Sequence, residues 1–239
     1  MILQALLQAD VHVNIHTKSH ASTPLIMACM RAQHGHVALL LDAGADVNAV
    51  DANGRTAIFH AALTRSIEMV RIFVQAQADV NRVDEFGRSP LIEASVSWGM
   101  ECVQTLLNAG VNVSAADPRG QTALHHACWR GPLGVANILL EANAPINQAD
   151  SDGYTALHIA SSQGDVAMCK LLLEHGAPPD LLDALGRTTI HCACTGNHPK
   201  MVRLLLGANA QVQTSQMNGE TPLHSASRDG FVKIVRALF

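Results

Sequence analysis

Histidine and cysteine are the residues of this sequence that could bind a metal ion or activate a nucleophile. The densest group is His191, Cys192 and Cys194, with His198 close behind, and both residue types are common zinc ligands. On a helix, however, residues two positions apart point about 200° away from one another. Cys192 and Cys194 therefore do not converge on one ion, and we predict no metal site.

The second chemistry to consider is nucleophilic catalysis, in which a neighbouring base activates a nucleophile. His125 and His126 lie close to Cys128 in the sequence, but side chains one or two positions apart on a helix do not face each other. The chain also lacks a glycine-rich phosphate loop of the GxxxxGK[ST] type. We therefore predict no catalytic residue, no cofactor and no enzyme activity.

The elements that position these side chains follow from an internal repeat. One Thr or Ser position returns every 33 residues, at Thr23, Thr56, Ser89, Thr122, Thr155, Thr188 and Thr221. A glycine stands two positions before all but the first of these residues. An aspartate stands five positions before, except at Lys18 and Gln216. Cys29, Cys128 and Cys194 share one position of the repeat with small residues such as Ser95, so we expect them to pack between helices.

Each repeat predicts a turn, a first helix, a second helix and a loop. Asp-x-x-Gly is typical of a turn, because aspartate can accept a hydrogen bond from the backbone and glycine adopts positive φ. The Thr that follows is a favoured N-cap. A break near Gly164 leads to a second helix over residues 166–174. We expect the residue that follows the second helix of each repeat to adopt the left-handed conformation found after many helices. The residues at this position are Gly44, Gln77, Gly110, Asn143, Gly176 and Asn209, and Gln77 is the poor fit.

The segments Asp150-x-x-Gly153-x-Thr155-Ala156-Leu157-His158 and Gly44-Ala45-Asp46-Val47-Asn48 resemble the ankyrin repeat. The resemblance covers nearly the whole chain and implies an all-α solenoid of stacked helix-turn-helix repeats with short β-turn hairpins. It also implies that His125, His158, His191 and His224 hydrogen-bond the loop backbone together with the Thr three residues earlier.

We assign one repeat domain over residues 1–239, and its repeats have the following bounds. A partial repeat spans 1–16, full repeats span 17–50, 51–83, 84–116, 117–149, 150–182 and 183–215, and a truncated repeat spans 216–239. Both ends fall inside expected second helices, which favours a piece of a longer protein.

Composition excludes several classes of function. The net charge of −4 does not fit a dedicated nucleic-acid binder. No apolar run approaches the roughly 18 residues of a membrane-spanning helix, so we expect no membrane insertion. The six cysteines are scattered, which favours reduced thiols in an intracellular protein, cytoplasmic or nuclear.

Three asparagines at one loop position are candidates for modification, because the ankyrin family includes substrates of an asparaginyl hydroxylase. They are Asn48, Asn81 and Asn147. We favour a structural role for them, in which each asparagine caps the local backbone.

In the ankyrin family, partners bind on the concave side, which is formed by the hairpin tips and the exposed edge of the first helices. The matching positions of this chain hold a group of aromatic and arginine residues in the third to fifth repeats: Phe86, Arg88, Arg119, Trp129, Arg130 and Tyr154. Interface hot spots are enriched in Trp, Tyr and Arg. We therefore predict that this group binds an acidic or aromatic segment of a protein. Trp98 instead occupies the turn between two helices.

These observations favour a non-enzymatic scaffold that binds a protein or peptide segment. Two narrower alternatives stay open: the substrate-recognition module of a ubiquitin-ligase adaptor, and a cytoplasmic repeat array of a membrane-associated protein. Sequence outside residues 1–239 would distinguish them, as a ligase-binding box or as membrane-spanning segments.

Overall fold

The Thr and Ser positions of the repeat each begin a helix in the computed structural model, which describes residues 12–239 apart from the side chain of Arg130. Thr56 and Ser89 have extended backbones and accept hydrogen bonds from the amides of Phe59 and Ile92, three residues later. These bonds satisfy amide groups that the first turn of a helix leaves without partners. The predicted capping role is confirmed. Residues 1–11 of the expected partial repeat at 1–16 lie outside the described residues.

The chain divides into an N-terminal unit, Met1–Pro118, and a C-terminal unit, Arg119–Phe239. In the N-terminal unit the first helices are α2 (Pro24–Met30), α4 (Ala57–Leu63) and α6 (Pro90–Val96), and the second helices are α3 (His34–Asp42), α5 (Ile67–Gln75) and α7 (Met100–Asn108). In the C-terminal unit the first helices are α8 (Ala123–Arg130), α10 (Ala156–Gln163), α12 (Thr189–Thr195) and α14 (Pro222–Arg228), and the second helices are α9 (Leu133–Glu141), α11 (Val166–Glu174), α13 (Pro199–Gly207) and α15 (Val232–Leu238).

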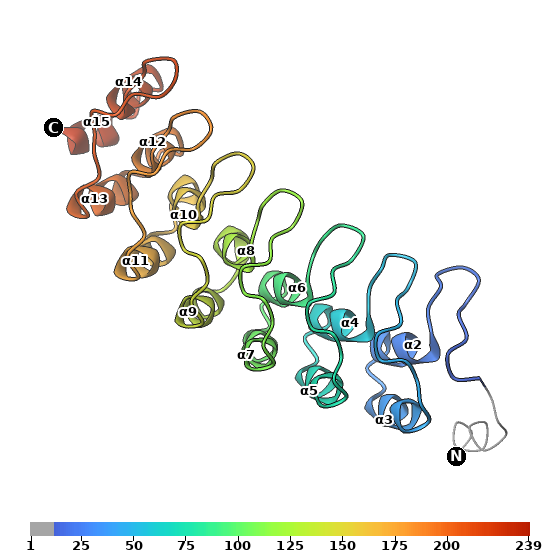
Figure 1. The fold of residues 1–239 in the computed structure, drawn as a ribbon. Helices are drawn as coiled ribbons and strands as arrows, with labels where there is room; N and C mark the ends of the chain where they lie inside the picture. The colour runs from blue at the N-terminus through green and yellow to red at the C-terminus, as the bar shows by residue number, and fades with distance from the viewer. Residues whose placement is uncertain (1–11) are drawn as a thin grey trace. The chain divides into compact units, whose positions relative to one another are not determined.

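Within each unit, a helix packs against its partner in the same repeat and against the equivalent helices of neighbouring repeats. Figure 1 shows the first helices of each unit in one row, the second helices in another, and the hairpins projecting beside the first helices. This arrangement is an all-α repeat solenoid, as the sequence predicts. A single repeat cannot bury its own apolar face, so stacking provides the core.

The core is built from repeat positions rather than from isolated residues. Leu25, Ile58 and Leu91 occupy the same position of successive first helices, and each is at most 1% exposed. On the second helices of the C-terminal unit, one position is filled in turn by Ala136, Cys169 and Val202, all fully buried. Cysteine here replaces a small aliphatic side chain in a packing position.

The loops have the predicted turn geometry. Asp51 Oδ1 accepts hydrogen bonds from the amides of Asn53 and Arg55, at 2.9 and 3.0 Å, and Gly54 has a φ of +73°. Gln77, the poor fit in the sequence, nevertheless adopts the left-handed conformation with a φ of +57°. Its repeat keeps the loop geometry of the others, so the stack imposes the conformation on a residue that does not favour it.

Candidate protein-binding surfaces

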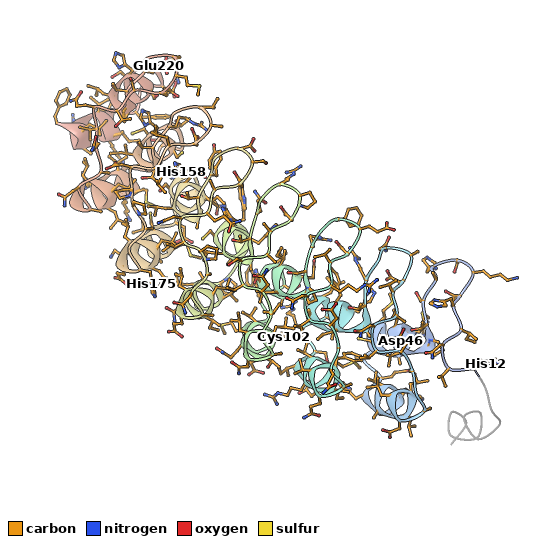
Figure 2. All side chains as sticks on the ribbon, in the orientation of Figure 1. His12, Asp46, Cys102, His158, His175 and Glu220 are labelled. Atoms are coloured by element: carbon orange, nitrogen blue, oxygen red, sulfur yellow. The ribbon has the colours of Figure 1, made fainter. Side chains whose placement is uncertain are left out.

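The hairpins of the C-terminal unit are held by buried histidines. His158, on α10 (Figure 2), accepts a hydrogen bond at Nδ1 from the Thr155 amide at 3.3 Å, and its Nε2 donates to the Arg187 carbonyl of the next hairpin at 3.2 Å. His125 makes the equivalent bond to the Tyr154 carbonyl at 3.0 Å. These contacts confirm the loop-bonding role for both histidines.

Burial lowers the pKa of His125, His158 and His191 below the ordinary histidine value, although for His125 and His158 a hydrogen bond to a backbone carbonyl of the next hairpin opposes the shift. The imidazoles are therefore neutral near pH 7. His191 differs from the other two, because its Nε2 is buried without a hydrogen-bond partner among the described residues.

The surroundings of the cysteines bear on whether they could act as nucleophiles or metal ligands. All six thiols are free and buried, and burial raises the pKa of Cys29, Cys192 and Cys194 to about 12. A buried thiol with a raised pKa is a poor nucleophile and a poor metal ligand. Within residues 12–239, no three His, Cys, Asp or Glu side chains come together in a way that could hold a metal ion.

The N-terminal unit holds its hairpins differently, because Ile26, Phe59 and Ile92 stand where the C-terminal unit has histidine. In the second repeat, His60, the residue after Phe59, takes the place of the missing histidine. Its Nε2 lies 2.8 Å from Asp51 Oδ2, and both side chains are buried. Sequence reasoning missed this pair. Its signal was a histidine one position past the expected one, nine residues after the hairpin aspartate.

The pKa of Asp51 lies below the ordinary aspartate value. Burial alone would raise it, but hydrogen bonds from the Arg55 amide, the His60 ring and the Asn53 amide together outweigh burial. The Asp51 carboxylate is thus ionised and has both oxygens engaged within its own repeat.

Phe86 on the third hairpin of the N-terminal unit forms a cluster with Arg88 of the same hairpin and Arg55 of the second hairpin. The Phe86 side chain is 57% exposed, and the Arg55 and Arg88 guanidinium carbons lie 5.9 and 5.8 Å from its ring centroid. Arg88 also lies 3.2 Å from Glu93, and Arg55 Nε donates to Asp84 at 3.2 Å. Both guanidinium groups are within cation–π distance of the ring.

Apolar side chains form a stripe along the first helices of the same unit. Met30, Leu63 and Val96 occupy one repeat position, seven residues after the cap, and are 51%, 39% and 36% exposed. Because α2 packs on α4 and α4 on α6, the stripe crosses three neighbouring helices. We call these three residues, with the hairpins beside them, the hairpin face of the N-terminal unit.

In the C-terminal unit, the predicted residues have different surroundings. Trp129 on α8 is 46% exposed. Tyr154 is half-buried, its ring lies 5.5 Å from the Arg187 guanidinium carbon, and Arg187 donates a hydrogen bond to its hydroxyl group. A cavity of about 250 Å³ adjoins this pair, lined by Tyr154, Ser162, Arg187, Cys192, Thr195 and Gly196.

The six predicted residues are thus divided between the units. The structure brings Phe86 and Arg88 together in the N-terminal unit and pairs Tyr154 with Arg187, which is outside the predicted six, in the C-terminal unit. Arg119 is exposed, and its carbonyl accepts a hydrogen bond from the Ser151 amide at 2.8 Å. Arg130 ends α8, and its side chain lies outside the described residues.

The modification candidates also differ in their surroundings. Asn48 Oδ1 accepts a hydrogen bond from the Asp79 amide at 2.8 Å, and Asn81 Oδ1 from the Asn112 amide at 2.7 Å. The residue 31 positions after Asn147 is Pro178, which has no amide hydrogen. Asn147 is exposed. Hydroxylation stays a prediction for all three asparagines.

The repeats match three family models. A model of ankyrin repeats in three copies matches residues 1–84 and 157–239, a model of ankyrin repeats in many copies matches residues 106–160, and a model of the single ankyrin repeat matches residues 86–118. The fold and its exposed hairpin surfaces are those of a repeat protein of the interaction class. The chain belongs to the ankyrin-repeat family. None of the curated proteins matches it.

Ankyrin repeats are generally protein–protein interaction modules, and proteins built from them are typically non-enzymatic. None of the helices that the structure describes is both long and apolar enough to cross a membrane.

Proposed function

We propose that this chain is a non-enzymatic scaffold that binds a protein or peptide segment on its hairpins and first helices, the concave groove of the family. The observation that supports it best is the exposure of large apolar side chains there. Phe86, on a hairpin, is 57% exposed, and Trp129, on a first helix, is 46% exposed. Neither residue is needed for a turn or for the core, whereas burial by a partner would remove such side chains from water.

Each unit contributes its own contact residues to this proposal. In the N-terminal unit they are Phe86 and Arg88, and in the C-terminal unit they are Arg119, Trp129, Arg130 and Tyr154. Arginine can form paired hydrogen bonds with carboxylates, and aromatic rings supply apolar anchors. The preferred partner segment is therefore acidic or contains aromatic residues.

The proposal extends to activity and location. The buried thiols have raised pKa values and the buried histidines of the C-terminal unit are neutral, which supports a chain without a catalytic centre. Six free cysteines support an intracellular location, in the cytoplasm or the nucleus.

The test is affinity capture followed by a binding measurement on the purified partner. Trp129→Ala should weaken binding about 30-fold or more, because truncation of an aromatic hot spot typically costs about 2 kcal/mol. Trp98→Ala is the matched control: it makes the same chemical change at a tryptophan that is 58% exposed but lies in an inter-helix turn.

Isothermal titration with the captured partner measures both variants against the wild type. Equal affinity for Trp129→Ala and the wild type would remove Trp129 from the site. Equal weakening by the two variants would show that the partner does not bind specifically on the hairpin side of the C-terminal unit.

A further inference from the structure

The N-terminal unit contains a cavity of about 450 Å³ beside the apolar stripe. This volume lies in the range of roughly 300–1,000 Å³ that is typical of ligand-binding pockets. Its walls are the first two hairpins and the helices α2 and α4, and its lining residues include Met27, Met30, Leu63, His20, Asp51 and Arg55.

One side of the cavity is apolar and adaptable. Met30 and Leu63 are 51% and 39% exposed, and Met27, also in the lining, is half-buried. Methionine is flexible and polarisable and can follow the shape of a bound apolar group. An aliphatic side chain of a partner would cover exposed apolar area on this wall, and that burial is favourable.

The other side offers hydrogen-bond donors. The Arg55 guanidinium is fixed by Nε, which donates to Asp84, and by the Phe59 ring 5.1 Å from its central carbon. Its two terminal nitrogens make no hydrogen bond with the described residues. A guanidinium held in this way presents paired donors to a carboxylate at little entropic cost.

The charges around the cavity favour an anionic group. Among the residues that the structure describes, Asp51 is the only acidic side chain in its lining, and both of its oxygens are engaged by His60 and by two backbone amides. The first hairpin has Lys18 where most repeats have aspartate, and exposed His20 lines the cavity.

We infer that this cavity binds a protein segment in which an aliphatic residue stands next to an acidic one. The aliphatic side chain occupies the wall of Met27, Met30 and Leu63, and the acidic side chain pairs with Arg55. This inference rests on the proposed function for the choice of a protein partner and adds the chemistry that the N-terminal unit selects.

The test uses the full chain with ¹³C-labelled methionine methyl groups and three peptides. The probe is Ser-Gly-Asp-Leu-Gly-Ser, and its two counterparts carry Asn for Asp or Ala for Leu. The probe should shift the Met27 and Met30 methyl signals saturably at millimolar concentration, while each counterpart should bind about tenfold more weakly. Equal shifts with all three peptides, or no shift at about 5 mM peptide, would overturn the inference.

Variants locate the binding. Leu63→Gln and Arg55→Lys should each weaken binding of the probe at least about tenfold, with thermal melting confirming that both are folded. Arg71→Gln, at an exposed arginine on α5, is the control and should bind like the wild type.

Unchanged binding by Leu63→Gln would overturn the inference. So would the same methionine shifts appearing on concentration without peptide, since a second copy would then fill the cavity.

The outcome separates the two proposals. If the peptides fail but Trp129→Ala still abolishes capture of a partner, the inference about the cavity fails and the proposed function stands. If the peptides bind as expected while Trp129→Ala has no effect, the inference about the cavity stands and the proposed binding role of Trp129 fails. Partner binding is then assigned to the N-terminal unit alone. If both experiments fail, both proposals fail.

Discussion

His158 accepts one hydrogen bond through Nδ1 and donates another through Nε2. Both bonds can form together only when the ring is neutral, because a protonated imidazole has no acceptor nitrogen. The ring is fully buried, so it links α10 to the next hairpin instead of exchanging protons with solvent. His125 does the same one repeat earlier.

This arrangement predicts that acid destabilises the C-terminal unit. Burial lowers the pKa of His158 in the folded protein, whereas in the unfolded chain it is near 6.5. As the pH falls through that value, the unfolded state binds more protons, so the free energy of unfolding decreases. The stabilising contribution of the neutral ring is therefore present above about pH 6.5 and is lost below it.

Thermal melting of the full chain between about pH 7.5 and pH 5 measures the effect. His158→Gln should be less stable than the wild type at pH 7.5, because it loses the inter-repeat bond. It should also lose less stability on acidification, with a difference on the order of 1 kcal/mol. His36→Gln, at an exposed position on α3, controls for the chemical change. Identical losses in His158→Gln and the wild type would contradict the prediction.

At the scale of elements, each hairpin supports its neighbour directly. The Ala184 amide donates to the Asp152 carbonyl at 2.9 Å, and the Glu85 amide donates to the Asn53 carbonyl at the same distance in the N-terminal unit. The backbones approach so closely that a Cβ atom at Gly153 would lie 2.8 Å from Asp183. Glycine is therefore required both for its positive φ and for this contact.

A comparison of Gly153 with Gly176 separates the effect of positive φ from the effect of the close contact between hairpins. Gly153 and Gly176 have φ values of +80° and +83°, but a Cβ at Gly176 would meet nothing within 4 Å. Gly176→Ala should thus cost about 1 kcal/mol for the left-handed backbone alone. Gly153→Ala should cost about 2–4 kcal/mol, because the hairpins must also separate.

Chemical denaturation of both variants gives the two free energies of unfolding. A larger loss for Gly176→Ala, or equal losses, would show that contact between hairpins does not determine the stability of this unit.

At the scale of the whole molecule, each unit is stabilised by repetition of one set of packing positions. The six cysteines occupy such positions and are all buried, from Cys29 on α2 and Cys102 on α7 (Figure 2) to Cys194 on α12. Because their partners are neighbouring helices of the stack, the thiols become accessible only when that stacking is lost. They therefore report on the folding of both units.

We predict that none of the six thiols reacts quickly in the folded protein. Burial raises the pKa of Cys169 to about 11 and that of Cys192 to about 12, so almost no thiolate is present at about pH 8. Reaction with a thiol reagent, followed residue by residue with mass spectrometry, should begin only at the denaturant concentration at which the helical signal is lost. Rapid labelling of any one cysteine in the native protein would contradict its burial.

Much of the fold follows from local chemistry. The cap at Ser89 and the turn at Asp51 depend on residues two to four positions away, so the repeat spacing predicted where helices begin and where hairpins turn. The candidate binding surfaces were less predictable. The Asp51–His60 pair depends on the orientation of two side chains within one repeat. The cation–π contacts of Arg55 with Phe86 and of Arg187 with Tyr154 depend on which side chains of adjacent hairpins face each other. Spacing alone specifies neither.

The amino-acid sequence by itself determined the length of the repeat, the helix pairs, the hairpins and the family, because caps and turns are short-range and recur every 33 residues. Only the tertiary structure decided which residues act together. Phe86 makes cation–π contacts with Arg55 and Arg88, and Met30 and Leu63 line a cavity with Arg55. The physical reason is that most of these contacts join side chains of neighbouring repeats, and the stacking of the repeats and the side-chain rotamers set their distances.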